Sequence, residues 1–254
     1  MRIKNGVTII GLHGLPEIKE GDDLGSLIAD AIAKQRLRIE EGDIIVVTHK
    51  IVSKAEGRLI SLSEIIPSNF AYRVASESNK DPRYVEAVLR ESKRIVKMKN
   101  GHLIVEHRLG HICANAGIDR SNVAPNMIAM LPLDPDKSAA KIRESLEEIY
   151  GVKVGVIVTD TCGRPFRKGQ VNIAIGVSGL KPLKSYVGTP DRFGNKLRST
   201  VIAVADELAS AAELVMGKVD EVPVVLVKGY DYTYTPRKVT AKALVRESEK
   251  DLFA

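Results

Sequence analysis

The sequence predicts a mixed α/β (α+β) fold in which mixed sheets are flanked by helices. Three observations predict it: short continuous apolar runs typical of buried strands, longer segments in which apolar residues recur with helical spacing, and turn residues that separate the two kinds. No internal repeat with a period of about 20 to 50 residues interrupts this alternation. The order of the strands within the sheets does not follow from the sequence.

Strands are expected at the apolar runs and at one hairpin. An uninterrupted run of Ile and Val follows Gly42, which is typical of a strand buried on both faces. Residues 94–106 predict a hairpin that turns at Asn100-Gly101. The other predicted strands are residues 7–12, 43–48, 152–159 and 222–228.

Helices are expected where apolar residues share one face and capping residues mark the ends. Asp22 or Asp23 would cap the first helix, and Asp81-Pro82 would begin the second. The predicted helices are residues 22–35, a segment that starts at Pro82, residues 138–150 closed by Gly151, an alanine-rich stretch at 199–216 ended by Gly217, and the tail at 239–252.

The length of 254 residues allows one large domain or two small ones. We expect a single domain over residues 1–254, which could divide into two lobes near residues 60–72 or 130–137. Proline and polar residues gather in both of these segments.

The composition excludes several classes of protein. No stretch approaches the roughly 18 consecutive apolar residues of a membrane-spanning helix, and the first residues lack the pattern of a signal peptide. The two cysteines cannot build a disulfide scaffold, which indicates the cytoplasm. The net charge of +6 suits anionic small molecules, while the lack of Trp argues against a platform that stacks bases. We therefore expect neither a membrane nor nucleic acid as a partner.

Charged residues follow two of the predicted buried strands, where ligands collect in α/β sheets. Lys50, Lys54 and Arg58 come after the strand at 43–48, and their cations suit phosphate oxygens. Asp160-Thr161 comes after the strand at 152–159, with Arg164 and Arg167 beyond it. A carboxylate beside a hydroxyl supplies the hard oxygen ligands that Mg²⁺ or Mn²⁺ prefers. The alternative is a solvated polar exit from each strand, and the composition alone does not decide between the two.

A third polar segment covers residues 113–123. Its small residues would let the backbone approach a ligand closely, and Asp119 and Asn122 would supply oxygen atoms. The alternative is an ordinary Asx-type turn, which the composition favours when this segment is taken by itself.

Several common catalytic signatures are absent from the sequence. There is no GxxxxGK[ST], GxGxxG, HExxH or GxSxG motif, so a bound nucleotide would not be held by a P-loop. Cys162 is interpreted as a small half-buried thiol rather than a nucleophile. Glu207 and Glu213 are interpreted as surface charges, and an Asp206 or Glu207 that faces a neighbouring site is the less favoured alternative.

Several ordered motifs resemble one known family. VVTHKIVSKAEGR, ICANAGIDRSNV and VIVTDTCGRPFRKGQVNIAIGVSG occur in that order, and GLHGLPEIKEGDDL, MLPLDPD and ADELASAAELVMG fit as well. Together they resemble the coenzyme F420-0:L-glutamate ligase family over roughly residues 9 to 230.

The resemblance implies an enzyme that binds GTP and joins L-glutamate to the lactyl carboxylate of F420-0. An acyl phosphate would be the intermediate, GDP and phosphate would be released, and a second, γ-linked glutamate would follow on F420-1. The resemblance also implies two Mn²⁺ or Mg²⁺ ions, K⁺ as an activator, and an intertwined homodimer.

The resemblance further implies a set of site residues. Asp119 and Asp160 would bind one metal ion, Thr161 would bind a second, and Asp160, Lys54 and Arg164 would be catalytic. The nucleotide contacts would be Leu15, Pro16, Glu17, Ile18, His49, Lys50, Lys54, Asn122, Met216, Gly217, Lys218, Val219, Asp220, Glu221 and Val222.

One position departs from the family pattern. Lys218 stands where the family usually has a Glu that ligates the second metal ion. A cation cannot ligate a metal, so either Asp220 or Glu221 takes over or the second ion is held more weakly.

Two other functions stay open from the sequence. One is a different nucleotide-dependent carboxylate–amine ligase or kinase on a related scaffold. The other, which explains less of the sequence, is a basic protein that binds nucleic acid. The interpretation as an F420-0:L-glutamate ligase requires that Asp119 and Asp160 lie close together in the fold.

Overall fold

The computed structural model describes residues 6–99, 101–236 and 239–250. Its centre is a five-stranded sheet with the strand order β1-β12-β2-β8-β9. These strands are β1 (Thr8–Leu12), β12 (Val224–Lys228), β2 (Ile44–Thr48), β8 (Gly155–Gly163) and β9 (Gln170–Ser178). Only β2 and β8 are parallel, and the other neighbours pair in the antiparallel sense.

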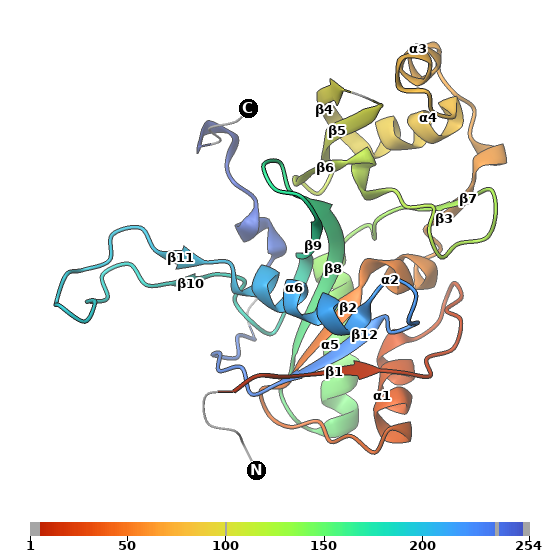
Figure 1. Ribbon diagram of the computed structural model, residues 1–254. Coiled ribbons are helices and arrows are strands. Elements are labelled where there is room, and N and C mark those ends of the chain that lie inside the picture. The colour runs from red at the N-terminus through yellow and green to blue at the C-terminus, as the bar shows by residue number, and fades with distance from the viewer. Residues whose placement is uncertain (1–5, 100, 237–238, 251–254) are drawn as a thin grey trace.

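Helices cover both faces of this sheet (Figure 1). α1 (Leu24–Lys34) and α5 (Pro135–Tyr150) pack on one face, and α6 (Val204–Met216) packs on the other. Successive strand residues point to opposite faces, so Ile45 of β2 joins the first core and Ile44 joins the second. Burial on both faces explains the continuous Ile and Val run in the sequence.

Residues 59–129 form a second unit with a core of its own, drawn at the top of Figure 1. The chain enters through β3 (Leu59–Ser61) and leaves through β7 (Met127–Ala129), and these two strands pair with each other. Between them lie α3 (Asn69–Ser78), α4 (Pro82–Glu91), and a sheet of β4 (Ser92–Lys99), β5 (His102–His107) and β6 (Ile112–Ala114).

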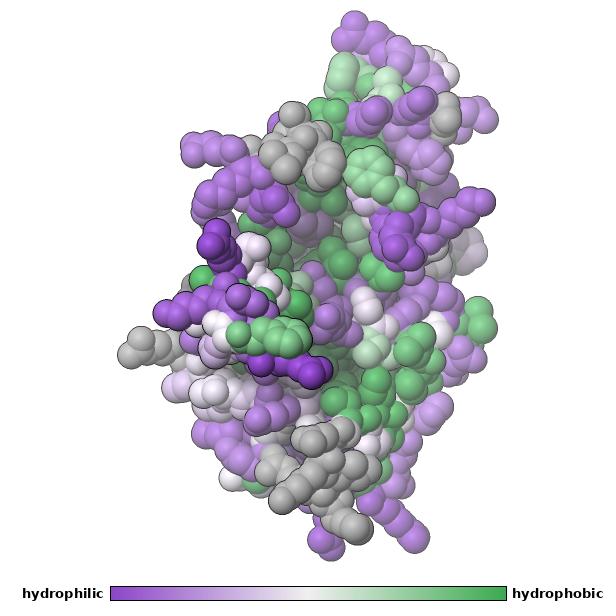
Figure 2. Space-filling view, turned by 60° about the vertical axis from the view of Figure 1, so that its left-hand side comes forward, coloured by the Kyte–Doolittle hydropathy of each residue, from purple (hydrophilic) through white to green (hydrophobic). Residues whose placement is uncertain are grey.

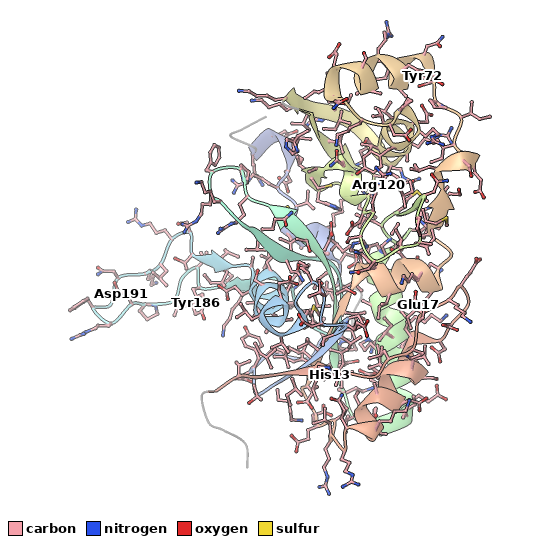
Figure 3. All side chains as sticks on the ribbon, turned by 45° about the vertical axis from the view of Figure 1, so that its right-hand side comes forward. His13, Glu17, Tyr72, Arg120, Tyr186 and Asp191 are labelled. Carbon is pink, nitrogen blue, oxygen red and sulfur yellow. The ribbon has the colours of Figure 1, made fainter. Side chains whose placement is uncertain are left out.

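A long arm projects from the main sheet between β9 and α6 (Figures 1 and 3). Its base is the short pair β10 (Lys184–Ser185) and β11 (Val201–Ile202), and Figure 3 labels Tyr186 and Asp191 further out. The space-filling view, which brings the arm forward, shows apolar side chains among the polar ones at this surface (Figure 2). Phe193 on the arm is 79% exposed.

Most predicted elements are present with shifted ends. The strands at 7–12, 43–48 and 222–228 and the hairpin at 94–106 are confirmed, although Asn100 at the turn lies outside the described residues. Asp23 caps α1, and its carboxylate accepts a hydrogen bond from the Gly25 amide.

Other boundaries were wrong. The predicted strand at 152–159 runs instead to Gly163, because β9 pairs with it as far as that residue. α5 starts at Pro135 rather than 138, since Asp134 provides the N-cap. α6 starts at 204 rather than 199, because residues 201–202 pair in the arm.

The predicted tail helix at 239–252 was also wrong over the residues that are described. The chain there makes two short 3₁₀ turns, η3 (Ala241–Leu244) and η4 (Ser248–Lys250). Ala241 is buried, and its amide donates to Asp136, so packing against α5 decides this conformation. A helix without a continuous apolar face gains little from packing. The lobe boundaries near 60–72 or 130–137 stay a prediction.

No helix among the described residues is long and apolar enough to cross a membrane.

Gly176 allows β9 to approach α5 closely. A Cβ built on Gly176 would collide with the backbone carbonyl of Pro135, so we expect Gly176→Ala to lower the free energy of unfolding by about 1–3 kcal/mol. Urea unfolding measures this change. Gly163→Ala is the control, because nothing lies within 4 Å of the Cβ built there. Equal stabilities of the two variants would contradict this explanation.

Candidate active site

The parallel pairing of β2 with β8 brings two candidate residues together. Thr48 and Thr159 are direct partners in this ladder, so His49 and Asp160 follow at the same edge of the sheet. The Nε2 atom of His49 lies 3.3 Å from Oδ1 of Asp160, and both residues are buried. The same oxygen of Asp160 accepts a hydrogen bond of 2.7 Å from the Thr161 amide. The carboxylate is therefore held in one orientation.

His49 is the first residue of α2 (His49–Ala55), and the next residue reaches the second candidate aspartate. The Lys50 Nζ atom lies 2.8 Å from Oδ2 of Asp119, and it also donates to the Ser121 hydroxyl at 2.7 Å. The other oxygen of Asp119 accepts from the Ser121 amide at 2.7 Å, which is an Asx turn. The first turn of α2 thus contacts both Asp119 and Asp160 through adjacent side chains.

The charge on Asp119 is stabilised by these contacts. Burial by itself would raise the pKa of Asp119, but the Lys50 ammonium and the Ser121 donors outweigh it and lower the pKa below its usual value. Asp119 is therefore ionised at neutral pH. An ionised carboxylate beside a lysine is a suitable place for phosphate groups and a cation to meet.

A ring of four side chains surrounds the hydroxyl of Thr161. The Lys218 Nζ atom lies 2.8 Å from Thr161 Oγ1 and 2.6 Å from Oε1 of Glu213. Thr161 donates to Asn172 Oδ1 at 3.0 Å, and the amide group of Asn172 donates to the second Glu213 oxygen at 2.7 Å. The ring joins β8, β9, α6 and the loop after α6.

Two further segments of the predicted nucleotide site meet α2 and this ring. Lys54 on α2 lies 2.5 Å from Glu17, whose side chain is 76% exposed. The Asn122 amide donates to the Lys218 carbonyl at 3.4 Å, which joins the segment at 113–123 to the loop at 216–222.

The remaining predicted nucleotide residues differ in exposure. Ile18, Met216 and Val222 are buried in the two cores, and Val219 is 86% exposed. A Cβ on Gly217, which has φ +58°, would collide with the Asp220 carboxylate, so glycine is needed at this turn. Contacts to a ligand from the buried residues would have to come from their backbone atoms.

The structure places two of the predicted phosphate-binding cations elsewhere. Arg164 lies beyond β8 and donates to the carbonyls of Gly169 and Lys168 in its own turn. Arg58 donates to the Leu131 carbonyl at 3.0 Å and to Glu91 at 2.9 Å. Arg58 therefore joins the main sheet to the second unit.

Sequence reasoning missed part of this site. Glu213 was interpreted as a surface charge, but it lies in the ring with Lys218, and its side chain is only 22% exposed. Asn172 is 2% exposed, and a polar residue inside the apolar run of β9 was the signal that could have found it. Among the described residues, no three His, Cys, Asp or Glu side chains are grouped as ligands for a metal ion.

The sequence profile of the family described as F420-0:Gamma-glutamyl ligase matches residues 14–229. The chain belongs to this ligase family. The match contains every residue of the ring around Thr161 and both aspartates that α2 contacts, Asp119 and Asp160.

Curated relatives agree with this assignment over almost the whole length. The chain is 46% identical to the coenzyme F420:L-glutamate ligase of Methanothermobacter thermautotrophicus over 98% of this chain and 99% of that protein. It is 48% identical to the protein of the same name from Methanopyrus kandleri, over 93% of both chains. The Archaeoglobus fulgidus protein of that name is 46% identical over 97% of this chain and 96% of its own.

Glu91 makes the contacts between Arg58 and the second unit sensitive to pH. Glu91 is 6% exposed, and Arg108 donates to both of its oxygens, at 2.9 and 2.8 Å. Burial would raise the pKa of Glu91, but His107 and the two arginines lower it from 4.5 to about 2. The stabilisation is therefore complete above about pH 4.5 and is lost as the pH falls towards 2.

We expect Glu91→Gln to cost about 3 kcal/mol of unfolding free energy at pH 7, the equivalent of that pKa difference. The cost should shrink when urea unfolding is repeated at pH 3. Glu144→Gln, which removes a 68% exposed carboxylate, is the control and should cost little at either pH. A cost that does not change with pH would show that the charge of Glu91 is not the cause.

Proposed function

We propose that this protein is a GTP-dependent ligase of coenzyme F420 biosynthesis that acts in the cytoplasm. It adds L-glutamate to the lactyl carboxylate of F420-0, and then a second, γ-linked glutamate to F420-1. Family membership over residues 14–229 supports the substrate class. The observation that carries the proposal is the first turn of α2, where adjacent residues contact Asp160 and Asp119.

The chemistry proceeds in two steps. An oxygen of the lactyl carboxylate attacks the γ-phosphorus of GTP, the bond to GDP breaks, and an acyl phosphate forms. The glutamate amine then attacks the carbonyl carbon, phosphate leaves with the bonding electron pair, and the nitrogen loses a proton. Both steps depend on positioning and on neutralising negative charge, and neither requires a covalent bond to the protein.

Residues at α2 supply positive charge for the phosphoryl groups. Lys54 lies on the same helix as Lys50, one turn further on, and its partner Glu17 is exposed enough to move aside. Lys54 would then bind phosphate oxygens. In this proposal Arg164 would also have to release the carbonyls of its own turn before it could contact a phosphate.

The residues present fit one divalent cation. Asp119 and Asp160 are hard oxygen donors, and Mg²⁺ typically takes one or two carboxylates together with phosphates and water. The Lys50 ammonium lies 2.8 Å from Oδ2 of Asp119, so Lys50 would have to move aside or share this carboxylate when the ion binds. Asp119 and Asp160 would hold the Mn²⁺ or Mg²⁺ ion, which would neutralise charge on the phosphates.

The side chains around Thr161, in their present positions, do not fit a second divalent cation. The Lys218 ammonium is 2.8 Å from the Thr161 hydroxyl, so two positive charges would share one small oxygen. We assign no step to a second ion. K⁺ as an activator follows from the resemblance, and we assign no residue to it.

The projecting arm supports a homodimer as part of the proposal. The β10–β11 pair and the segment between them extend away from the body, with Phe193 and Val187 exposed at 79% and 54%. A second copy of the chain that receives this arm would bury these side chains.

Asp160→Ala is expected to abolish ligation. The change removes the carboxylate that His49 and the Thr161 amide orient, so rates should fall at least a thousandfold, the order of a lost charge-stabilising group. The purified protein is incubated with GTP, Mn²⁺, L-glutamate and F420-0, and mass spectrometry follows the glutamyl increment. Glu144→Ala is the control. If the wild-type protein adds no glutamyl group to F420-0 but adds one to a different acid, the protein is a ligase for that acid instead.

Lys54→Met is expected to raise the KM for GTP about tenfold or more, because one charge-assisted contact to phosphate would be lost. The KM for L-glutamate should stay within about twofold. Lys141→Met, which changes an exposed lysine of α5, is the matched control. Calorimetry with GDP tests the same point without turnover, and an unchanged affinity would contradict the role of Lys54.

A further inference from the structure

The outer edge of β9 is closed by two aspartates. β9 is the last strand of the main sheet, so alternate amides along its free edge have no neighbouring strand. Asp206 accepts from the Ala174 amide at 2.9 Å, and Asp136 accepts from the Val177 amide at 2.8 Å. Asp206 therefore faces the space beside β9, rather than open solvent on the far side of α6.

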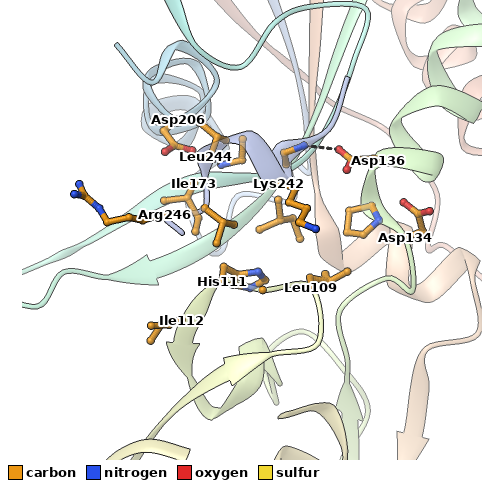
Figure 4. Close-up of a pocket in the computed structure, with 16 residues that line it drawn as sticks. Leu109, His111, Ile112, Asp134, Asp136, Ile173, Asp206, Lys242, Leu244 and Arg246 are labelled. Carbon is orange, nitrogen blue, oxygen red and sulfur yellow. Dashed lines mark hydrogen bonds between the residues drawn. The ribbon is translucent and has the colours of Figure 1, made fainter. Parts of the chain in front are cut away.

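A cavity of about 290 Å³ lies along this edge (Figure 4). Leu109 and His111 form one wall, and Ile173 and Leu244 form the opposite wall. The volume is just below the roughly 300–1,000 Å³ that is typical of sites for drug-sized molecules. It suits a ligand of amino-acid size rather than the much larger F420-0.

The cavity borders the candidate active site. Ile173, which lines the cavity, is the direct cross-strand partner of Asp160. Such partners have Cα atoms about 4.5–5.5 Å apart and point to the same face of the sheet. A ligand in the cavity would therefore lie next to the place where we expect the acyl phosphate to form.

Three charged residues of the cavity, Asp206, Lys242 and Arg246, form no ion pair among the described residues. Asp206 uses one oxygen for the Ala174 amide, and its second oxygen accepts no hydrogen bond from the described residues. Burial raises the pKa of Asp206 because it disfavours the ionised carboxylate, so a cation beside Asp206 would stabilise the ionised form. Lys242 and Arg246 line the same cavity, and the Arg246 guanidinium donates to the Lys250 carbonyl at 3.5 Å.

The charged residues of the cavity are divided between its two ends. In Figure 4, Asp206 and Arg246 lie at one end of the cavity, with the Arg246 guanidinium directed outward, and the Lys242 side chain extends towards the other end. Asp134 and Asp136 also line that second end, where Asp134 accepts from the Lys137 amide and Asp136 accepts from the amides of Val177 and Ala241. Asp206 and Arg246 at one end and Lys242 further along offer contacts to one ammonium group and two carboxylates, while Asp134 and Asp136 add two carboxylates beside Lys242.

His111 provides a further polar atom in the wall. Its Nε2 atom is buried and has no hydrogen-bond partner among the described residues, which is an unusual state for a native protein. Burial lowers the pKa of His111 to about 4, so the ring is neutral and can offer a hydrogen bond to a ligand.

We propose that this cavity binds the amino-acid substrate, L-glutamate, and that it is a site distinct from the nucleotide contacts at α2. Asp206 pairs with the α-ammonium, Arg246 with the α-carboxylate, and Lys242 with the side-chain carboxylate. The proposal rests on the proposed function, because it uses the amine that this reaction consumes. It gives Asp206 the place beside a neighbouring site that was the less favoured alternative from the sequence.

Asp206→Asn tests the contact to the ammonium group. The variant keeps an oxygen for the Ala174 amide and loses only the charge. We expect the KM for L-glutamate to rise at least tenfold, while kcat at saturating glutamate and the KM values for GTP and F420-0 stay within twofold. Glu207→Gln, a neighbouring exposed carboxylate that does not line this cavity, is the matched control. A fall in kcat with an unchanged KM for glutamate would overturn the proposal.

Ligand analogues test the two ends of the cavity separately by calorimetry. Glutarate lacks the ammonium group, so wild type should prefer L-glutamate over glutarate, and Asp206→Asn should remove that preference. L-glutamine lacks the second carboxylate, so Lys242→Met should remove the preference for glutamate over glutamine. Lys242 is exposed on a turn, so its change leaves folding intact. Preferences that survive both changes would place glutamate elsewhere.

Calorimetry also separates this proposal from the proposed function. If wild type binds L-glutamate and Asp206→Asn does not, the cavity is supported as the glutamate site even when no F420-0 is converted. Ligation of F420-0 with a normal KM for glutamate in Asp206→Asn refutes the cavity and leaves the proposed ligase intact.

Discussion

The parallel pairing of β2 with β8 is the constraint on which the candidate site depends. It is the one parallel pair in the five-stranded sheet, so β2 and β8 both end at the same edge. His49 and Asp160 then meet because each follows directly after a paired threonine. A shift of one residue in this register would turn Asp160 to the opposite face, away from His49. The Ile and Val side chains buried on both faces of β2 make such a shift costly.

The charges around this edge divide between two neighbouring spaces. Lysines and aspartates surround α2, where Lys50 contacts Asp119. The second space lies across β9, where Asp206, Lys242 and Arg246 line a cavity. Ile173 separates the two and pairs with Asp160. An edge strand thus places one polar region beside another without bringing their charged groups into contact.

The sequence predicted the elements better than their ends or their neighbours. The Ile and Val run of β2 and the cap at Asp23 depend on local chemistry, and both were found. The continuation of β8 to Gly163 depends on its partner β9, and the start of α6 depends on the arm, so neither could be found from local patterns. Within the site, Lys50 and Asp119 were singled out from the sequence. Their contact across 69 residues, and the contact of Glu213 with Lys218, required the fold.

Asp119 and Asp160 stand on separately packed parts of the molecule, since one belongs to the unit at residues 59–129 and the other to the main sheet. That unit is joined by two adjacent chain crossings, β3 and β7, which pair with each other. Rotation about this seam would change the spacing of the two aspartates. The Arg58–Glu91 pair spans the seam and opposes such a rotation. The Lys50–Asp119 pair crosses the same seam, so two salt bridges, one of them remote from both acids, hold the width of the gap between Asp119 and Asp160.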